Sequence, residues 1–357
     1  MRQPLLLFLL IVIIGVPGAA AQTWDTGTSY PPEAPFTVLT VLEGYWSDVQ
    51  FSEDLEQLAL RSRRKLAIVD TESGETIVSL TPPSAWIEFT GSPAFNADGT
   101  SVACSMTDGN VLIFSTETGE ATGTFPTQYY AVFSQDGGQI ATQDEPGEVA
   151  VWSTETGQLL FSMSEFSAQL TVIPLGFSHD DTFAFALGIP YSGNAITGAW
   201  NVATQSLIRV FPGIVRPLQD GSLLSLEPIL RNEDAPVDVR TCVSLWESVL
   251  GEPVQTFWIP GFMWSSAIDH TGQVLALAQQ DGTIHFWNIA EEREIHQLDL
   301  KTIVSDAEDV DYDEARIDHV RFSPDGTLLA TATWMSGPME RTYVQLWNIS
   351  ELLADGT

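Results

Sequence analysis

A degenerate phrase of about eleven residues recurs along this chain, and its spacing constrains the fold more than any other feature. Its clearest copy is FSPDGTLLATA, residues 322–332. Seven copies align on the aspartate of a tight turn, at Asp54, Asp98, Asp136, Asp180, Asp220, Asp269 and Asp325. By subtraction, successive aspartates are 44, 38, 44, 40, 49 and 56 residues apart. A period of this length predicts a small structural unit that packs only on its neighbours.

Each copy opens a unit in which four strand-like segments are separated by turns. An alternating segment follows the phrase, then a segment such as TIHFWN (residues 283–288), a turn such as STETGE (residues 115–120) and a fourth segment. Four short strands in about 40 to 45 residues are typical of a propeller blade. We therefore predict an all-β fold, a seven-bladed β-propeller with four-stranded antiparallel blades.

The repeats resemble the WD40-repeat family, in a divergent, bacterial and exported form, over residues 36–350. Tryptophan ends the third strand in five repeats, at Trp152, Trp200, Trp246, Trp287 and Trp347. Val69 and Phe114 hold that position in the other two, no Asp follows any of the five tryptophans, and no Gly-His dipeptide occurs. The buried His, Ser/Thr, Asp and Trp network of that family therefore does not transfer. We expect the blades to be held together mainly by apolar packing.

The last blade requires a strand from the opposite end of the chain. The seventh repeat stops after its third strand, because the residues that remain, NISELLADGT, are too polar and too few. FTVLTVL, residues 36–42, precedes the first repeat and has the character of an outer strand. An unpaired edge invites aggregation, so we predict that this N-terminal strand closes the last blade.

The N-terminus has the pattern of an export signal. Arg2 precedes an apolar run over residues 5–16, and Ala19, Ala20 and Ala21 precede an expected cleavage before Gln22. An uncleaved anchor is the alternative, although the unbroken core of residues 5–14 is shorter than the ~20 residues of a membrane span. We expect a signal peptide (1–21), an extended leader (22–35), the propeller (36–350) and a tail (351–357). The protein would be secreted or periplasmic, with no stable membrane span after cleavage.

Composition limits the partners. The formal net charge is −33, which opposes binding to nucleic acid and to anionic lipid.

Cys104 and Cys242 are the two cysteines, and the blade order places them across the ring from each other. A disulfide needs Cα atoms within about 7 Å, so both are expected to be unpaired. The protein is expected to be a monomer.

Surplus residues gather on one face of the predicted ring. The first-to-second and third-to-fourth turns share one face, here called the short-turn face, and the remaining loops share the other, the loop face. Insertions at 188–198, 227–241, 301–315 and 333–342 all fall on the loop face over blades four to seven. Such one-sided variation often marks a binding face. Aromatic candidates for contact there are Trp46, Trp86, Tyr129, Tyr130, Tyr191, Trp264 and Trp334. The alternative is that these rings fill gaps between blades.

The acidic segment 306–314 suggests a second kind of site. Asp309, Asp311 and Asp313 alternate like the start of a calcium loop, which needs clustered carboxylates. Glu314 and Val320 occupy positions that an EF-hand gives to Gly and Glu, so only an irregular calcium site remains open. The basic cluster of Arg61, Arg63, Arg64 and Lys65 is an alternative partner for this segment across the closure seam.

The chain carries no recognisable catalytic motif. Its five histidines, His179, His270, His285, His296 and His319, are not expected to converge on one site, and no nucleophile elbow, H-E-x-x-H or phosphate loop occurs. We therefore expect no cofactor and a noncatalytic module or scaffold that binds another protein through the loop face. Two alternatives stay open: a secreted or periplasmic propeller enzyme that uses the same face, and a calcium-dependent sugar-binding or adhesion module.

Overall fold

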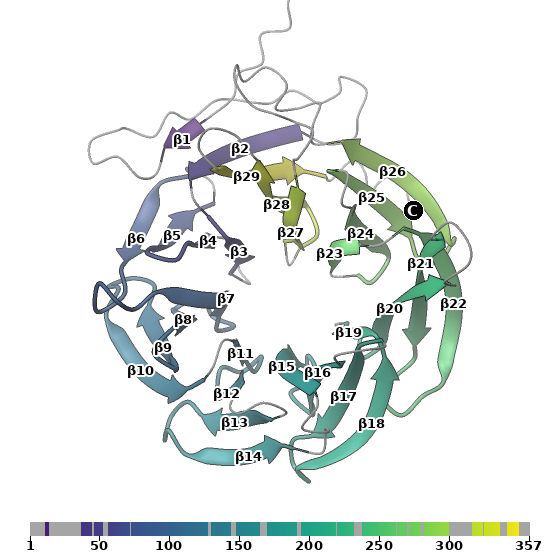
Figure 1. The fold of residues 1–357 in the computed structure, drawn as a ribbon, viewed down its shortest axis with the longest axis horizontal. Coiled ribbons are helices and arrows are strands. Elements are labelled where there is room, and N and C mark those ends of the chain that lie inside the picture. Colours follow the sequence, from purple (N-terminus) through teal and green to yellow (C-terminus); the bar gives the residue numbers. More distant parts are fainter. Residues whose placement is uncertain are drawn as a thin grey trace, which may run out of the picture.

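Seven small sheets stand around a central channel in the computed structural model of the chain (Figure 1). The structure describes residues 11–13, 37–44, 46–52, 56–71, 73–127, 130–143, 148–164, 170–190, 194–218, 220–231, 238–261, 263–269, 271–279, 282–299, 316–323, 325–335 and 341–349. All regular elements in these ranges are strands, and none is a helix. The predicted all-β, seven-bladed propeller is confirmed.

The blades follow one another in chain order, each from its inner to its outer strand. Blade 1 contains β3 (Asp48–Phe51), β4 (Gln57–Arg61), β5 (Leu66–Asp70) and β6 (Thr76–Leu80). Blade 2 contains β7 (Phe89–Phe95), β8 (Ser101–Met106), β9 (Asn110–Ser115) and β10 (Ala121–Pro126). Blade 3 contains β11 (Ala131–Phe133), β12 (Gln139–Gln143), β13 (Val149–Ser153) and β14 (Leu159–Met163).

The second half of the ring has longer strands. Blade 4 contains β15 (Leu170–Phe177), β16 (Phe183–Pro190), β17 (Ile196–Asn201) and β18 (Ser206–Pro212). Blade 5 contains β19 (Ile214–Pro217), β20 (Leu223–Arg231), β21 (Asp238–Trp246) and β22 (Pro253–Pro260). Blade 6 contains β23 (Met263–Ile268), β24 (Val274–Gln279), β25 (Thr283–Asn288) and β26 (Arg293–Asp299). Blade 7 contains β27 (Arg316–Phe322), β28 (Leu328–Met335) and β29 (Arg341–Asn348) from the C-terminal end.

The N-terminal strand closes blade 7, as predicted. β2 (Thr37–Gly44) pairs antiparallel with β29, from Thr37 opposite Asn348 to Gly44 opposite Thr342. Outside β2 lies the short strand β1 (Ile11–Ile13), which pairs with it in parallel (Figure 1). Blade 7 therefore joins the two ends of the chain through backbone pairing. No helix in the described part of the chain is long and apolar enough to cross a membrane.

The repeated phrase folds into one kind of hydrogen-bonded turn. In blade 7, Ser323 Oγ donates to Asp325 Oδ1 (2.7 Å) and accepts from the Leu328 amide (2.8 Å). Blade 6 departs from the predicted alignment, because Asp269 stands where blades 1, 3, 4 and 7 have a serine, and its Oδ1 accepts from the Val274 amide (2.7 Å). The aspartate of that phrase is thus displaced by two residues, and its carboxylate replaces the serine hydroxyl.

Apolar side chains form the interface between neighbouring blades, as expected. One core cluster joins Val49 and Leu58 of blade 1 to Ala330 and Val344 of blade 7. A partial Trp–hydroxyl network adds to this packing, since the indole N–H donates to a second-strand hydroxyl in three blades. These pairs are Trp152–Thr142, Trp246–Ser225 and Trp347–Thr331, at 2.9, 2.9 and 3.2 Å.

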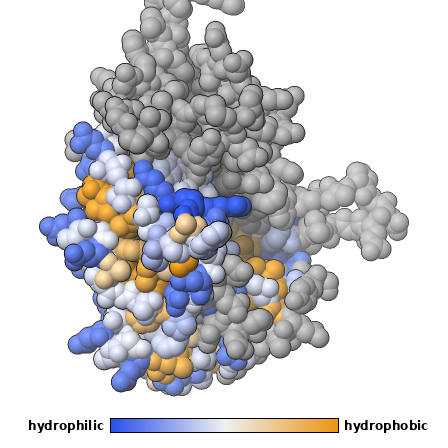
Figure 2. Space-filling model, turned by 60° about the vertical axis from the view of Figure 1, so that its left-hand side comes forward, coloured by the Kyte–Doolittle hydropathy of each residue, from blue (hydrophilic) through white to orange (hydrophobic). Residues whose placement is uncertain are grey.

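Other features of the ring concern its thiols and its outer surface. Cys104 on β8 is buried, Cys242 on β21 is half-buried, and both are free, as predicted. Outer strands expose apolar side chains, including Ile77, Leu159 and Val254. Hydrophobic clusters alternate with hydrophilic ones on the side of the ring drawn in colour in Figure 2.

Candidate functional site

The described parts of the loop-face insertions in blades 4, 5 and 7 mainly continue paired strands. In blade 5, β20 and β21 are 9 residues long and pair as far as Arg231 opposite Asp238, whereas β4 and β5 of blade 1 have 5 residues each. β28 and β29 of blade 7 have 8 residues each. Since these strands lead to second-to-third turns, the blades carry long hairpins toward the loop face. The hairpin tips at 191–193, 232–237 and 336–340, and the insertion at 301–315, lie outside the described residues.

Trp86 is the most exposed large hydrophobic residue that the structure describes. It lies on the loop face, in the connection from β6 to β7, and 93% of it is exposed. Arg64 Nη1 donates to the carbonyl oxygens on both sides of it, those of Ala85 (2.9 Å) and Ile87 (2.7 Å). The next residue, Glu88, donates its amide to Thr107 Oγ1 (2.9 Å) of blade 2. The loop is therefore tied to both blades while its indole faces solvent.

Trp46 occupies a different environment from Trp86. It is 3% exposed and belongs to the core between blades 1 and 7, with Lys65 Nζ 5.7 Å from its ring centroid. Burial lowers the pKa of Lys65. Trp46 thus fills a gap between blades, which was the alternative considered for these aromatics. Tyr130 is 38% exposed and lines the central channel.

The remaining predicted contact residues are not brought into one site by the described structure. Trp264 and Trp334 belong to β23 and β28, and their side chains lie outside what the structure describes. Outside the described residues are also Tyr129, Tyr191, Asp309, Asp311 and Asp313. Among the residues that are described, no group of three or more His, Cys, Asp or Glu is arranged to hold a metal ion.

Two histidines have defined carboxylate partners, in separate places. His285 Nδ1 lies 2.7 Å from Glu294 Oε1 on blade 6. His319 Nδ1 lies 3.3 Å from Asp48 Oδ1, and its Nε2 lies 3.0 Å from the Ser47 carbonyl oxygen. The second pair joins the inner strands of blades 7 and 1 at the closure seam. Each histidine–carboxylate pair therefore joins two strands, and the two pairs do not form one site.

The central channel holds a cavity of about 620 Å³ with walls from all seven blades. Seven wall residues, one from each blade, occupy the same position in the repeat. This position lies two residues before the residue that begins the first-to-second turn of the blade. The seven residues, from blade 1 to blade 7, are Gln50, Ala94, Val132, Gly176, Arg216, Ala267 and Arg321. We call this set the channel ring. Because it precedes the first-to-second turns, it lies toward the short-turn face, away from Trp86.

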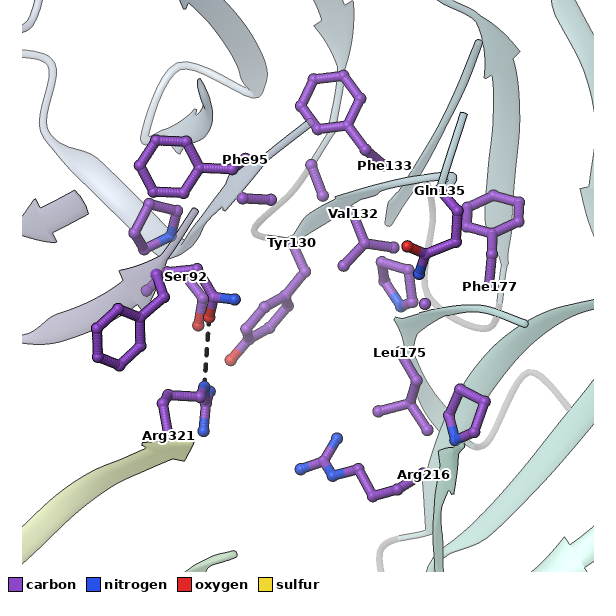
Figure 3. Close-up of a pocket in the computed structure, with 18 of the residues that line it drawn as sticks. Ser92, Phe95, Tyr130, Val132, Phe133, Gln135, Leu175, Phe177, Arg216 and Arg321 are labelled. Atoms are coloured by element: carbon purple, nitrogen blue, oxygen red, sulfur yellow. Dashed lines mark hydrogen bonds between the residues drawn. The ribbon is translucent and has the colours of Figure 1, made fainter. Parts of the chain in front are cut away.

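The two arginines of the channel ring point into the same open space (Figure 3). Arg321 donates to Gln50 Oε1 (3.3 Å) and to the Val320 carbonyl oxygen (2.9 Å). The guanidinium group of Arg216 forms no hydrogen bond or ion pair with any described residue. Desolvation, and secondarily the charge of Arg321, lower the pKa of Arg216 to about 10. It therefore stays protonated at neutral pH, as a cation without a protein counter-ion in the described structure.

The surplus loop residues, which predict the loop face as a contact surface, do not point to this arginine pair. The signal was nevertheless present in the aligned repeats. Arg216 and Arg321 stand at the same repeat position, where the described ring otherwise has small, apolar or neutral residues. Reading the alignment by column would have placed both guanidinium groups in the channel.

Fold and site together define a seven-bladed β-propeller with an open, arginine-bearing channel. The structure resembles a chain of Kuenenia stuttgartiensis hydrazine synthase with a TM-score of 0.63 and 11% sequence identity, over 82% of this chain and 95% of that one. No protein-family model matches the sequence, and no curated protein does. At this identity the likeness concerns the fold alone.

Proposed function

We propose that the protein is an exported, noncatalytic binding module of WD40-like type that engages another protein through its loop face. Trp86 is the observation that carries this proposal. A tryptophan that is 93% exposed loses apolar contact with other side chains, yet hydrogen bonds from Arg64 hold its loop in place. Tryptophan is enriched among the residues that dominate binding energy in protein interfaces. A preorganised loop also reduces the entropy lost on binding.

The long hairpins of blades 4, 5 and 7 support the same face as the contact surface. Paired strands carry the inserted residues outward as ordered elements, with β20 and β21 the longest. The opposite face has turns occupied by their own Ser–Asp hydrogen bonds, as at Ser323 and Asp325. Side chains engaged in this way have less capacity for a partner.

Crosslinking capture from the native extract tests the proposal. The mature protein is compared with Trp86→Ser and with Trp258→Ser, a control on the outer strand β22, where the side chain is 48% exposed. We expect Trp86→Ser to lose the captured partner, and Trp258→Ser to retain it. All three proteins should melt at similar temperatures, because neither side chain is buried. Equal capture by all three would place the binding surface elsewhere.

A further inference from the structure

We propose that the central channel binds a small organic anion whose carboxylate or phosphate head is held by Arg216 and Arg321. The site lies toward the short-turn face, so this inference goes beyond the proposed loop-face function and stands independently of it. It rests on two guanidinium groups that enter one cavity from equivalent positions of blades 5 and 7.

The charges of the channel wall favour an anion. The cavity wall contains these two arginines and no Asp, Glu, Lys or His among the residues described. This is unusual for a chain with a net charge of −33, in which carboxylates far outnumber cations. Two like charges in a partly desolvated space repel each other unless an anion joins them. The lowered pKa of Arg216 reflects the same cost.

The position of the two arginines suits a shared ligand. Blade 6 separates them and contributes Ala267 to the channel ring, so the wall between the two arginine positions carries a small side chain. A guanidinium presents a planar fork of N–H donors that matches the oxygens of a carboxylate or phosphate. Because Arg216 has no partner among the described residues, its donors are available without breaking an existing contact.

The rest of the wall indicates an organic body on the anion. Figure 3 shows Tyr130, Val132 and Leu175 near the open space into which the arginines point, whereas Phe95 and Phe133 lie farther from the guanidinium groups. The Tyr130 ring and the two aliphatic side chains offer apolar contact next to the charged end. The cavity of about 620 Å³ falls within the usual range of small-molecule sites, roughly 300 to 1,000 Å³. A bare inorganic ion would leave most of that apolar wall unused.

Isothermal titration of the full-length protein at constant ionic strength tests the proposal. The probes are phenyl phosphate and benzoate, compared with inorganic phosphate and neutral benzyl alcohol. The variants are Arg216→Gln and Arg321→Gln. Arg293→Gln is the matched control, since it removes the same charge from β26, where the Arg293 side chain is 55% exposed.

We expect the two aromatic anions to bind and benzyl alcohol not to bind. Each channel substitution should weaken binding at least about tenfold, as the loss of a charge-assisted hydrogen bond implies. Arg293→Gln should bind as the native protein does. Equal weakening by Arg293→Gln, or binding that survives both channel substitutions, would overturn the assignment. Equal affinity for inorganic phosphate and phenyl phosphate would refute the proposal that an organic part of the ligand contacts the apolar wall.

A second measurement avoids dependence on the stability of the variants. Phenylglyoxal modifies arginine, and peptide mass spectrometry can follow Arg216 and Arg321 separately in the native protein. Phenyl phosphate should protect both from modification, while benzyl alcohol should protect neither. Modification at an unchanged rate with every probe would overturn the proposal.

Discussion

The guanidinium carbon of Arg209, on β18 of blade 4, lies 4.7 Å from the ring centroid of Trp246, on β21 of blade 5. It also lies 5.3 Å from the ring of Phe211, which meets Trp246 edge to face at 5.1 Å. Arg209 Nη1 donates to the Gly251 carbonyl oxygen as well. One side chain thus joins two blades by a cation–π contact and a hydrogen bond.

Replacement of Arg209 by Met should therefore weaken the junction between blades 4 and 5. Loss of the charged hydrogen bond and the cation–π contact should cost about 1 to 3 kcal/mol in the free energy of unfolding. Glu252, whose carboxylate lies 3.7 Å from Arg209, is 87% exposed, so Glu252→Gln should cost at most about 1 kcal/mol. Urea unfolding measures both. Equal effects would mean that the ion pair carries the interaction.

Closure by β2 gives a prediction about the N-terminus. Removal of residues 1–44 takes away the whole outer strand of blade 7 and exposes the edge of β29. We expect a loss of at least about 3 kcal/mol, since each backbone hydrogen bond contributes about 0.5 to 1.5 kcal/mol net. Removal of residues 1–21 keeps β2 and should change the melting temperature much less, although it removes β1. Similar melting of both truncated chains would contradict the closure.

The architecture could be predicted because its determinants repeat. The FSPDGTLLATA phrase specifies a turn through local hydrogen bonds, such as those between Ser323, Asp325 and Leu328, and these depend little on the rest of the fold. Strand counting likewise identified residues 36–42 as the missing outer strand, because seven repeats left one strand position unfilled. Repetition thus provided several copies of each local signal.

The candidate site was harder to predict because it depends on how blades meet. Trp46 and Trp86 are both tryptophans near loops, yet one is 3% exposed and the other 93%. The difference comes from the neighbouring blade, which covers Trp46 through residues such as Val344 far along the chain. Arg216 and Arg321 similarly face one cavity only when the ring has closed. Such relations are absent from any single repeat.

The turn aspartates give the fold a dependence on pH. The hydroxyls of Ser178 and Thr182 both donate to Asp180 (2.6 Å each) and lower its pKa. Because the folded pKa lies below the unfolded one, ionised Asp180 stabilises the folded chain above about pH 4. This contribution disappears as the pH falls through the folded pKa. The pKa of Asp98 is lowered by Thr100 in the same sense, and that of Asp136 by Ser134.

Thermal melts between pH 2.5 and 6 can isolate the contribution of Asp180. Asp180→Asn should lower stability at pH 6 and reduce the further loss on acidification, since the amide does not titrate. Asp181 serves as a control of opposite sign, because desolvation raises its pKa. Ionisation of Asp181 therefore lowers the stability of the folded state as the pH rises. Asp181→Asn removes this effect and should make the loss of stability on acidification steeper. Identical slopes in both variants would contradict these pKa directions.

Two threonines on β28 separate the effect of a satisfied hydroxyl from that of an unsatisfied one. Thr331 Oγ1 accepts the indole N–H of Trp347 at 3.2 Å, and both residues are fully buried. Thr333 is equally buried, but its hydroxyl has no hydrogen-bond partner among the described residues. Valine has nearly the shape of threonine, so the two Thr→Val substitutions differ mainly in whether the lost hydroxyl took part in a hydrogen bond.

Thr331→Val should cost about 1 to 3 kcal/mol, because it removes the hydroxyl to which the buried Trp347 N–H donates. Thr333→Val should be neutral or stabilising, since it removes a buried hydroxyl that has no partner to lose. Ser225→Ala in blade 5 should resemble Thr331→Val, because Ser225 Oγ accepts from Trp246 at 2.9 Å. Guanidinium unfolding of the three variants measures the differences. If Thr333→Val lowers the free energy of unfolding as much as Thr331→Val does, the hydrogen bond from the indole N–H contributes little to the stability of the blade. Packing alone would then hold the blade together.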